Sequence, residues 1–419
     1  MRVLVLGGGL MGVTTACALA RDGHEVAVLD RAAGPAEGSS FANAGLVAPS
    51  HAYSWAAPGA PWNLLKSLFQ DDPPIRLRLK SDPAFWSWCL DFLRQCTADR
   101  FRANTLAKYR LCRYSQEVLH EVAAETGIDY QGTRKGLLYL YRSRESLDRA
   151  VAGGALLRGE GQVLEALDFD GVAAREPALE AARGRIAGGL YCPTDESGDA
   201  RLFTLGLAEV CRTLGVSFEW NRTIQGLETE GDRVVGVVTD GGVRSADAYV
   251  LALGVQAPVL ARSLGVRLPV YPVKGYSVTL PAGKGAPDMG GVEKDRFVAW
   301  ARFGDRLRLT ATAEFDGYDL NHRTDNFRGM WTVGRELFPE AADWSRPTYW
   351  AGLRPMTPSG APILGRGRHA NLWFNTGQGH MGWTMSCGSA RITADLIAGR
   401  APAIDLTGMT LEARPGVRT

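Results

Sequence analysis

The sequence predicts an α/β protein in which a domain with a buried parallel sheet is interrupted by a second domain with an antiparallel or mixed sheet and helices. Three observations support this fold class. The chain begins with a strand, a helix and a second strand, its middle carries short β-type runs separated by turns, and its end returns to a strand–turn–helix order. A chain of 419 residues accommodates about two or three domains.

Composition and charge exclude several classes of protein. The chain is 45% hydrophobic and 22% charged, which excludes intrinsic disorder, a disulfide scaffold and a polytopic membrane protein. The net charge is +2, so there is no overall basic field to hold nucleic acid. The seven cysteines contain no C-x-x-C pair, so we expect neither a metal site nor a disulfide framework, but reduced thiols in the cytoplasm.

The first thirty residues predict a βαβ unit. Residues 3–6 are an apolar run of strand length, 10–21 have a helical pattern, and 25–30 form a second strand. Although residues 3–20 carry no charge, three consecutive glycines break the apolar helix that a signal peptide would need. Residues 35–62 are dense in Pro, Gly, Ser and Ala, which is typical of a long functional loop.

The remaining elements follow from periodicity and turn residues. Helices are expected within 83–126 (two), and at 202–214, 326–337 and 383–397; strands are expected at 136–141, 217–220, 234–239, 248–253, 270–279, 297–301, 306–312 and 372–375. Gly241 and Gly242 predict a hairpin turn between the strands at 234–239 and 248–253. The nucleotide-binding domain is expected at 1–80, 191–265 and 346–419, and the second domain at 81–190 and 266–345, with Pro/Gly-rich joints near 266–272 and 353–362.

The first turn carries the motif Gly7-x-Gly9-x-x-Gly12 between a strand and a helix. The glycines allow a tight turn, a close approach to a pyrophosphate, and close helix–strand packing. Asp30 ends the second strand, where a carboxylate binds ribose hydroxyls and disfavours a 2′-phosphate. The motif therefore predicts a dinucleotide, NAD or FAD, against the alternative of a merely structural turn.

A second glycine cluster, Gly377-Gln378-Gly379-His380-Met381-Gly382-Trp383-Thr384, follows a strand and precedes a helix. Backbone N–H groups at such a turn can face the part of a flavin where negative charge develops on reduction. This favours FAD over NAD, although an ordinary strand–helix turn has the same pattern.

Six stretches in order along the chain carry a resemblance to a known family. They are VLVLGGGLMGVTTACALARDGHEVAVLDR, SSFANAGLVAPSHAYSWAAPGAP, GGLYCPTDESGDARLFT, VYPVKGYSVTLP, GLRPMTPSGAPILGR and LWFNTGQGHMGWTMSCGSARITADLIAGR. In these residues the chain resembles the FAD-dependent D-amino acid dehydrogenases of the small-subunit type, within the wider family of D-amino acid and glycine oxidases.

The resemblance implies a Rossmann-like FAD-binding domain interrupted by a substrate domain, with FAD bound non-covalently. It implies oxidation of a D-amino acid to an imino acid, which water hydrolyses to a 2-oxo acid and ammonia. Electrons would pass to a quinone or an artificial acceptor, and the protein would lie in the cytoplasm with a peripheral contact, weak or mediated by a partner, on the inner face of the membrane. The oligomeric state is not implied.

The resemblance also implies the residues that bind the cofactor. The adenosine diphosphate part would be held by Gly7, Gly9, Leu10, Met11, Gly12, Asp30 and Arg31. The pyrophosphate and flavin would be lined by Ser39, Ser40, Asn43, Ala44, Gly45 and Leu46, with Thr223 and Ile224 at the adenine and Ala252 and Gly254 at the ribityl chain. The flavin's pyrimidine edge would be covered by Gly377, Gly379, His380, Met381, Gly382, Trp383 and Thr384. Many relatives carry His at the position of Gln378 and a small residue at that of His380, so His380 either tunes the flavin or is a bystander.

Arg354 is the candidate anchor for the substrate carboxylate, because guanidinium is permanently charged and binds carboxylate through two hydrogen bonds. The alternative is an ion pair at the domain joint. Tyr271 and Tyr276 lie five residues apart, so their side chains are expected on opposite faces of one strand, with one able to reach the carboxylate.

Four further residues are candidates for the substrate pocket. Tyr53 and Trp55 are either pocket-wall aromatics or core residues, and His51 either accepts the amine proton or is structural. Lys274 either contacts flavin or substrate or is solvated. Two other functions stay open: a dehydrogenase of D-hydroxyproline or another secondary amine, or a glycine/sarcosine-type oxidase, of the same fold, and a dinucleotide-binding sensing module without catalysis.

Overall fold

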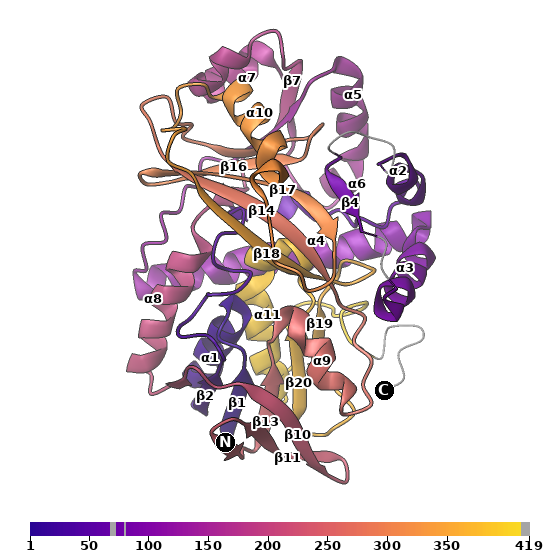
Figure 1. Cartoon of the computed structure of the whole chain (residues 1–419), viewed down its shortest axis with the longest axis vertical. Coiled ribbons are helices and arrows are strands. Elements are labelled where there is room, and N and C mark those ends of the chain that lie inside the picture. Colours follow the sequence, from indigo (N-terminus) through magenta and orange to yellow (C-terminus); the bar gives the residue numbers. More distant parts are fainter. Residues whose placement is uncertain (68–72, 79–80, 412–419) are drawn as a thin grey trace.

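A computed structural model describes residues 1–67, 73–78 and 81–411. Two sheets organise the chain, one in the lower half of Figure 1 and one in the upper half. The lower sheet has six strands in the order β19-β20-β13-β1-β2-β9. The upper sheet has nine strands in the order β18-β14-β17-β16-β15-β5-β7-β6, with β4 paired to β17.

The six-stranded sheet is parallel except at one edge, where β19 runs antiparallel to β20. Its strands are β1 (Arg2–Leu6), β2 (Glu25–Leu29), β9 (Ser217–Glu219), β13 (Ala248–Leu251), β19 (Ile363–Arg366) and β20 (Leu372–Thr376). The central strands are apolar runs buried on both faces, as strands between two helical layers must be.

Helices α1 (Leu10–Arg21), α8 (Ala200–Thr213) and α11 (Gly382–Ile397) pack on one face of this sheet. The other face packs against α9 (Ala257–Arg262) and a small antiparallel sheet of β10 (Ile224–Glu230), β11 (Arg233–Thr239) and β12 (Gly242–Arg244). The hydrophobic core of the domain therefore lies in two layers around β1 and β13.

The nine-stranded sheet carries the second core. Its strands are β4 (Ile75–Leu77), β5 (Leu137–Tyr141), β6 (Glu165–Asp168), β7 (Gly188–Cys192), β14 (Tyr271–Pro281), β15 (Gly290–Glu293), β16 (Val298–Phe303), β17 (Arg306–Phe315) and β18 (Thr348–Met356). Helices α7 (Phe169–Arg175) and α10 (Arg328–Leu337) and the 3-10 helix η2 (Pro177–Ala182) cover its outer face. The opposite face looks toward the six-stranded sheet.

The other elements connect or flank the two sheets. They are β3 (Leu46–Val47) paired with β8 (Glu196–Ser197), α2 (Ala60–Ser67), α3 (Pro83–Gln95), α4 (Ala98–Thr126), α5 (Arg144–Gly153), α6 (Ala155–Arg158), and the 3-10 helices η1 (Pro49–His51), η3 (Gly254–Gln256), η4 (Thr324–Phe327) and η5 (Gly379–Met381). Thr97 caps α4, the longest of these helices, by accepting from Arg100 N–H, and Gly127 ends it with φ 65°.

The predicted fold class is confirmed, and each element expected from periodicity exists at or near its predicted position. One connection was wrong, and several strands, among them β6, β7, β15, β18 and β19, were not predicted. The Gly241-Gly242 turn joins β11 to the short strand β12, whereas residues 248–251 pass on to the parallel sheet beside β1. The strand at 224–230, which pairs with β11, was not predicted, because its polar sequence gives no apolar alternation.

Sheet membership also moves two of the expected domain boundaries. β18 pairs along its whole length with β14, so the chain leaves the second domain after residue 356 rather than at 346, within the joint expected near 353–362. β4 pairs with β17, so part of the segment 1–80 belongs to the second sheet. Long α4 in turn packs on α11 of the first domain. The rest of the proposed division stays a prediction.

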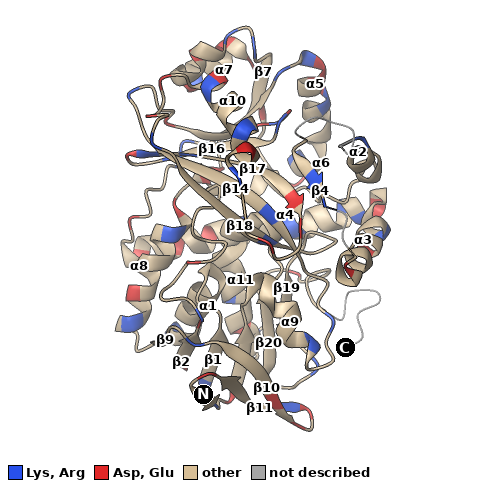
Figure 2. Ribbon diagram, viewed as in Figure 1, with Lys and Arg blue, Asp and Glu red and all other residues tan. Residues whose placement is uncertain are grey.

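All seven cysteines are free thiols. No helix among the described residues is both long and apolar enough to cross a bilayer. Within the same residues no group of three or more His, Cys, Asp or Glu side chains is placed to hold a metal ion. Basic and acidic side chains are interspersed over both halves of the molecule (Figure 2).

Candidate active site

A cavity of about 1180 Å³ runs from the turn after β1 to the inner face of the nine-stranded sheet. Residues of the glycine turn, of the loop 37–48, of the segment after β13 and of the turn before α11 line it on one side. Residues of β14, β17 and β18 line it on the other. The cavity is therefore built by both domains and is continuous from one to the other.

The turn between β1 and α1 is shaped by glycines that leave no room for a side chain. A Cβ on Gly7 (φ +113°) would lie 2.6 Å from the Ala252 carbonyl oxygen, and one on Gly12 would lie 1.7 Å from the Gly7 oxygen. A Cβ on Gly9 would only touch Ser40 Oγ at 3.9 Å, and Gly9 lines the cavity. Gly7 and Gly12 thus allow the packing, and Gly9 leaves the start of α1 open to an anionic ligand.

Asp30 lies beside this turn at the end of β2. Its carboxylate accepts hydrogen bonds from Gly8 N–H at 2.6 Å and Ala32 N–H at 2.8 Å, and it lines the cavity. These two donors fix its orientation, and a carboxylate retains acceptor capacity for the hydroxyls of a ribose. This is the arrangement that a dinucleotide without a 2′-phosphate requires.

The loop after residue 37 is fixed between the two domains. Ser39 Oγ donates to the Leu353 carbonyl of β18, and Arg308 of β17 donates to the Asn43 carbonyl at 3.1 Å. Gly45 has φ +70°, and a Cβ there would lie 2.2 Å from the Phe303 ring. The second domain therefore holds in place the loop that closes over the middle of the cavity.

Most of the predicted cofactor residues line this one cavity. They are Gly7, Gly9, Leu10, Met11, Asp30, Arg31, Ser39, Ser40, Asn43, Ala44, Gly45, Leu46, Thr223, Ile224, Ala252, Gly254, Gly379, His380, Met381, Gly382 and Trp383. An extended dinucleotide fits this donor set, with the glycine cradle at one end and the turn before α11 at the other. The residues present therefore fit FAD.

Three predicted cofactor residues do not line the cavity: Gly12, Gly377 and Thr384. Gly12 is occupied with helix–strand packing, and Gly377 (φ +79°) is packed against Thr357. Thr384 accepts from Ala48 N–H at 3.1 Å and donates to the Leu46 carbonyl at 3.3 Å. Its hydroxyl therefore positions the loop that lines the cavity.

Arg354 projects from β18 into the cavity. One terminal nitrogen donates to the Thr312 carbonyl at 2.8 Å, and the guanidinium lies over Gly275, where a Cβ would be 2.4 Å away. No acidic side chain among the described residues pairs with it, and burial lowers its pKa to about 10. Because it has no acidic partner among these residues, the ion-pair alternative for Arg354 is wrong. A buried guanidinium without such a partner is stabilised by a carboxylate ligand.

A bulge in β17 aims this anchor. Between the pairs Lys274–Glu314 and Tyr276–Ala311 the register shifts, so β17 carries one residue more than β14. Thr312 lies inside the bulge with φ +68°, a conformation that costs a β-branched residue about 1–3 kcal/mol. Its carbonyl accepts the hydrogen bond from Arg354. The strained backbone of Thr312 therefore supplies the carbonyl that orients the carboxylate anchor.

Three aromatic rings on the wall of the cavity and the buried ring of Tyr139 behind them form a row. Trp55 stacks on His380 with centroids 4.8 Å apart, His380 meets His51 edge-on at 5.9 Å, and His51 stacks on Tyr139 at 5.7 Å. Burial, and after it the charges of nearby lysines, holds the pKa of both histidines well below its usual range. Both imidazoles are therefore neutral hydrogen-bonding groups at pH 7.

Tyr139 leads from this row into a buried polar cluster. Its hydroxyl donates to Asp195 at 3.0 Å, and Ser50 also donates to that carboxylate. Burial raises the pKa of Asp195 to about 7. The cluster holds η1, and with it His51, against the second domain.

The chain matches the family model described as FAD dependent oxidoreductase (DAO) over residues 2–396. It belongs to this family. Among its relatives, "D-amino acid dehydrogenase 2" of Mesorhizobium japonicum is 45% identical over 413 residues, 98% of this chain and 99% of the relative. The "D-amino acid dehydrogenase" of Methylobacterium nodulans is 46% identical over 414 residues, 97% of this chain and 98% of the relative.

Solved structures of the DAO type share the fold. Glycine oxidase from Geobacillus kaustophilus superposes with a TM-score of 0.77 at 23% identity, covering 98% of both chains. L-proline dehydrogenase from P. horikoshii gives a TM-score of 0.73 at 18% identity, covering 96% of this chain and 94% of that one. The DAO membership confirms FAD as the cofactor type and excludes the non-enzymatic sensing module.

Three predicted substrate residues lie outside the cavity of this DAO chain. Tyr271 packs under α3 and donates to Asp82, and Tyr276 lies in the core of the second domain, where its hydroxyl donates to Glu314. The two tyrosines do point to opposite faces of β14, but neither reaches the cavity. Tyr276 points away because the pairing of β14 places Gly275 on the face shared with Arg354. Tyr271 lies on that same face but at the start of the strand, where it packs against α3.

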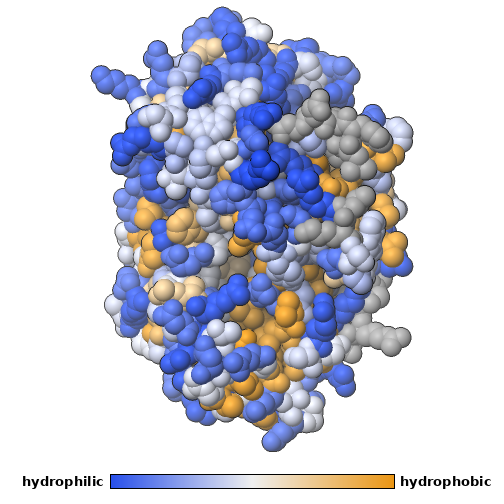
Figure 3. Space-filling model, viewed as in Figure 1, coloured by the Kyte–Doolittle hydropathy of each residue, from blue (hydrophilic) through white to orange (hydrophobic). Residues whose placement is uncertain are grey.

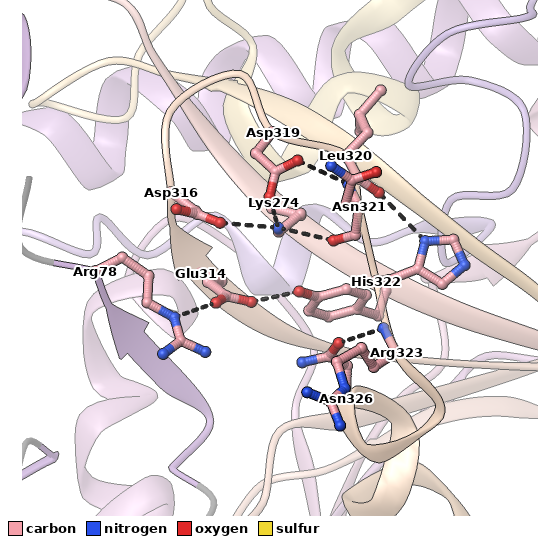
Figure 4. Close-up of polar contacts among 11 residues, drawn as sticks. Arg78, Lys274, Glu314, Asp316, Asp319, Leu320, Asn321, His322, Arg323 and Asn326 are labelled. Carbon is pink, nitrogen blue, oxygen red and sulfur yellow. Dashed lines mark hydrogen bonds and ion pairs between the residues drawn. The ribbon is translucent and has the colours of Figure 1, made fainter.

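Lys274 is neither a cavity residue nor a solvated one. Its side chain is 2% exposed, and Nζ lies 3.2 Å from Asp316, 3.5 Å from Asp319 and 3.2 Å from the Asn321 carbonyl (Figure 4). Three oxygens thus neutralise the ammonium inside the protein. Its role is to tie the loop after β17 to β14.

The other three substrate candidates, His51, Tyr53 and Trp55, do line the cavity. Sequence reasoning missed Lys294, Thr312 and Gly275, which line it as well. Gly275 lies inside the predicted strand, within the stretch VYPVKGYSVTLP. A glycine within a strand indicates that another group approaches closely, so the sequence did contain a signal for this position. Nothing local marks Lys294 or Thr312, because their positions depend on pairing between distant strands.

Proposed function

We propose that the protein is an FAD-dependent D-amino acid dehydrogenase that oxidises a D-amino acid to the imino acid, which hydrolyses to a 2-oxo acid and ammonia. The single observation that carries the proposal is Arg354, a buried guanidinium without an acidic partner in the described chain, on the wall of the cavity that also holds the dinucleotide turn. The names of relatives at 45–46% identity support the D configuration.

Each residue of the site has a separate role. Arg354 binds the α-carboxylate, and its hydrogen bond to the Thr312 carbonyl restricts the direction in which it can do so. His51 and His380 have depressed pKa values, so they stay neutral and are poor proton acceptors. The positive charges that, after burial, lower these pKa values also disfavour an ammonium beside them. Trp55 and Tyr53 complete an apolar wall that excludes water. Bound FAD supplies the hydride acceptor.

We propose a quinone-type electron acceptor and a peripheral contact with the inner face of the cell membrane. Helix α3 supports this, because it is apolar on two sides. Phe85, Trp88 and Phe92 face inward, whereas Trp86, Leu90 and Leu93 are 49%, 57% and 48% exposed. A surface helix of this kind has a face without a partner.

Neighbouring α2 exposes Trp62 (60%) and Leu65 (46%). The same two helices line the cavity with their inner sides, through Leu64, Trp88 and Phe92. Figure 3 shows apolar atoms at the right edge of the molecule, at the height of α2 and α3. An apolar acceptor in a bilayer would thus be separated from the cavity by the thickness of a helix.

Anaerobic addition of substrates to the FAD-loaded protein tests the proposal. D-alanine and other D-amino acids are expected to bleach the flavin absorption, and the L-enantiomers are not. D-proline, 4-hydroxy-D-proline, glycine and sarcosine test the two related activities in the same assay. If no D-amino acid bleaches the flavin faster than its L-enantiomer, the proposal is wrong.

A further inference from the structure

Lys294 is a cation on the cavity wall for which the proposed reaction has no use. It directly follows β15, and its backbone N–H donates to the Leu140 carbonyl at 2.9 Å, which fixes the base of the side chain. Its Nζ lies 5.8 Å from the centroid of the Tyr139 ring and 5.4 Å from that of Phe297. Within the described chain this ammonium has neither a carboxylate within ion-pair distance nor a hydrogen-bond acceptor.

The surroundings of Lys294 are electropositive. Its charge acts on both histidines of the aromatic row, and the charges of Lys108 and Arg354 act there as well. Two acidic residues flank Lys294 along the chain. Glu293 is buried and pairs with Arg142 at 2.7 Å, and Asp295 lies exposed at the cavity wall and accepts from the Arg142 backbone N–H at 2.9 Å. Burial lowers the pKa of Lys294 to about 8, so the ammonium stays charged at neutral pH. A charged, partly buried ammonium without an acceptor gains from an anionic ligand.

The aromatic row relates Lys294 to the carboxylate anchor. The rings run from Trp55 through His380 and His51 to Tyr139, and Lys294 lies over Tyr139 at the far end. Arg354 is close enough to His380 to act on its pKa. Because an amino acid has one α-carboxylate and Arg354 is there to bind it, the second cation is left for the end of the substrate's side chain.

We propose that Lys294 is a specificity-determining residue that binds an acidic side chain of the substrate. The enzyme therefore favours D-glutamate or D-aspartate over their uncharged amides and rejects cationic D-amino acids. This inference rests on the proposed function, since it assigns the substrate class of that same site. It concerns the substrate's side chain, so it leaves the roles of Arg354 and FAD unchanged.

Selectivity between isosteric substrates tests this assignment. In the parent enzyme, kcat/KM for D-glutamate should exceed that for D-glutamine by about tenfold or more, because a hydrogen bond to a charged group adds that much binding. Lys294→Met should remove the preference, and Lys294→Glu should reverse it in favour of D-lysine. Lys284→Glu makes the same charge change at an exposed lysine outside the cavity and should leave the preference intact.

A binding measurement separates this inference from the proposed function. Glutarate has two carboxylates and no amine, and butyrate has one carboxylate. Glutarate should perturb the flavin absorption at a lower concentration than butyrate, and Lys294→Met should abolish that difference. An unchanged preference in Lys294→Met overturns the inference while the proposed function stands. A protein that oxidises no D-amino acid overturns the proposed function, and glutarate binding then still tests Lys294.

Discussion

Arg354 shows how much one side chain depends on its backbone surroundings. The glycine at 275 makes room for the guanidinium, and the strained carbonyl of Thr312 orients it. A carboxylate that binds there exchanges water for a fork of N–H donors without requiring the protein to rearrange. The anchor is therefore preorganised.

Arg354→Met should raise KM and lower kcat/KM for D-amino acids by about a hundredfold or more, because it leaves the substrate carboxylate buried without a partner. Arg354→Lys keeps the charge but loses the fork of donors, so its kcat/KM should lie between that of Met and that of the parent. Steady-state kinetics with an artificial acceptor measure both variants. If KM is the same in all three proteins, another residue anchors the substrate.

The two neutral histidines predict the pH dependence. Their pKa values are lowered by burial and nearby cations, so neither imidazole gains a proton in the range where the enzyme is assayed. The logarithm of kcat/KM should therefore rise with pH while the substrate's amine loses its proton, and fall above about pH 10, where Arg354 loses its charge. An additional limb near pH 6.5 that disappears in His51→Ala would show that His51 titrates and accepts the proton.

At the scale of elements, the turn from β1 into α1 depends on a glycine for its close packing. Gly12 allows close packing, since its Cβ would overlap the Gly7 oxygen, whereas a Cβ on Gly34 would have nothing within 4 Å of it. Gly12→Ala should lower the free energy of unfolding by about 1–3 kcal/mol and reduce the FAD content. Gly34→Ala, in the same cofactor domain, should change neither. Thermal unfolding and the ratio of flavin to protein absorbance measure both effects.

Sites formed by residues close together in the sequence were predicted, and sites formed by pairing of distant strands were not. The β1–α1–β2 unit and its glycine turn were predicted, because one short stretch contains the strand, the helix and the carboxylate of Asp30. The face of β14 that meets the cavity was not predicted, because a bulge in β17 and the pairing to β18 decide which side chains reach it. Tyr276 and Lys274 were misplaced for this reason, and Lys294 was missed because no motif surrounds it.

At the scale of the whole molecule, the exposed apolar residues of α2 and α3 predict binding to a bilayer. The parent protein should sediment with lipid vesicles, and Leu90→Glu combined with Leu93→Glu should release it without changing the oxidation of D-amino acids by a soluble dye. Val163→Glu changes an exposed apolar residue (46%) elsewhere and should leave binding intact. Equal sedimentation of the double variant and the parent would contradict a membrane contact through α3.

The loop at residues 39–45 is held on one side by Leu353 and Arg308 and faces the cofactor cavity on the other. A ligand in that cavity therefore contacts both domains at once. Binding to the native state alone adds about 2.7 kcal/mol of stability when free ligand is a hundred times its Kd. The cellular supply of riboflavin-derived cofactor would then control how much of this chain survives proteolysis, so that cofactor status regulates the abundance of the enzyme as well as its activity.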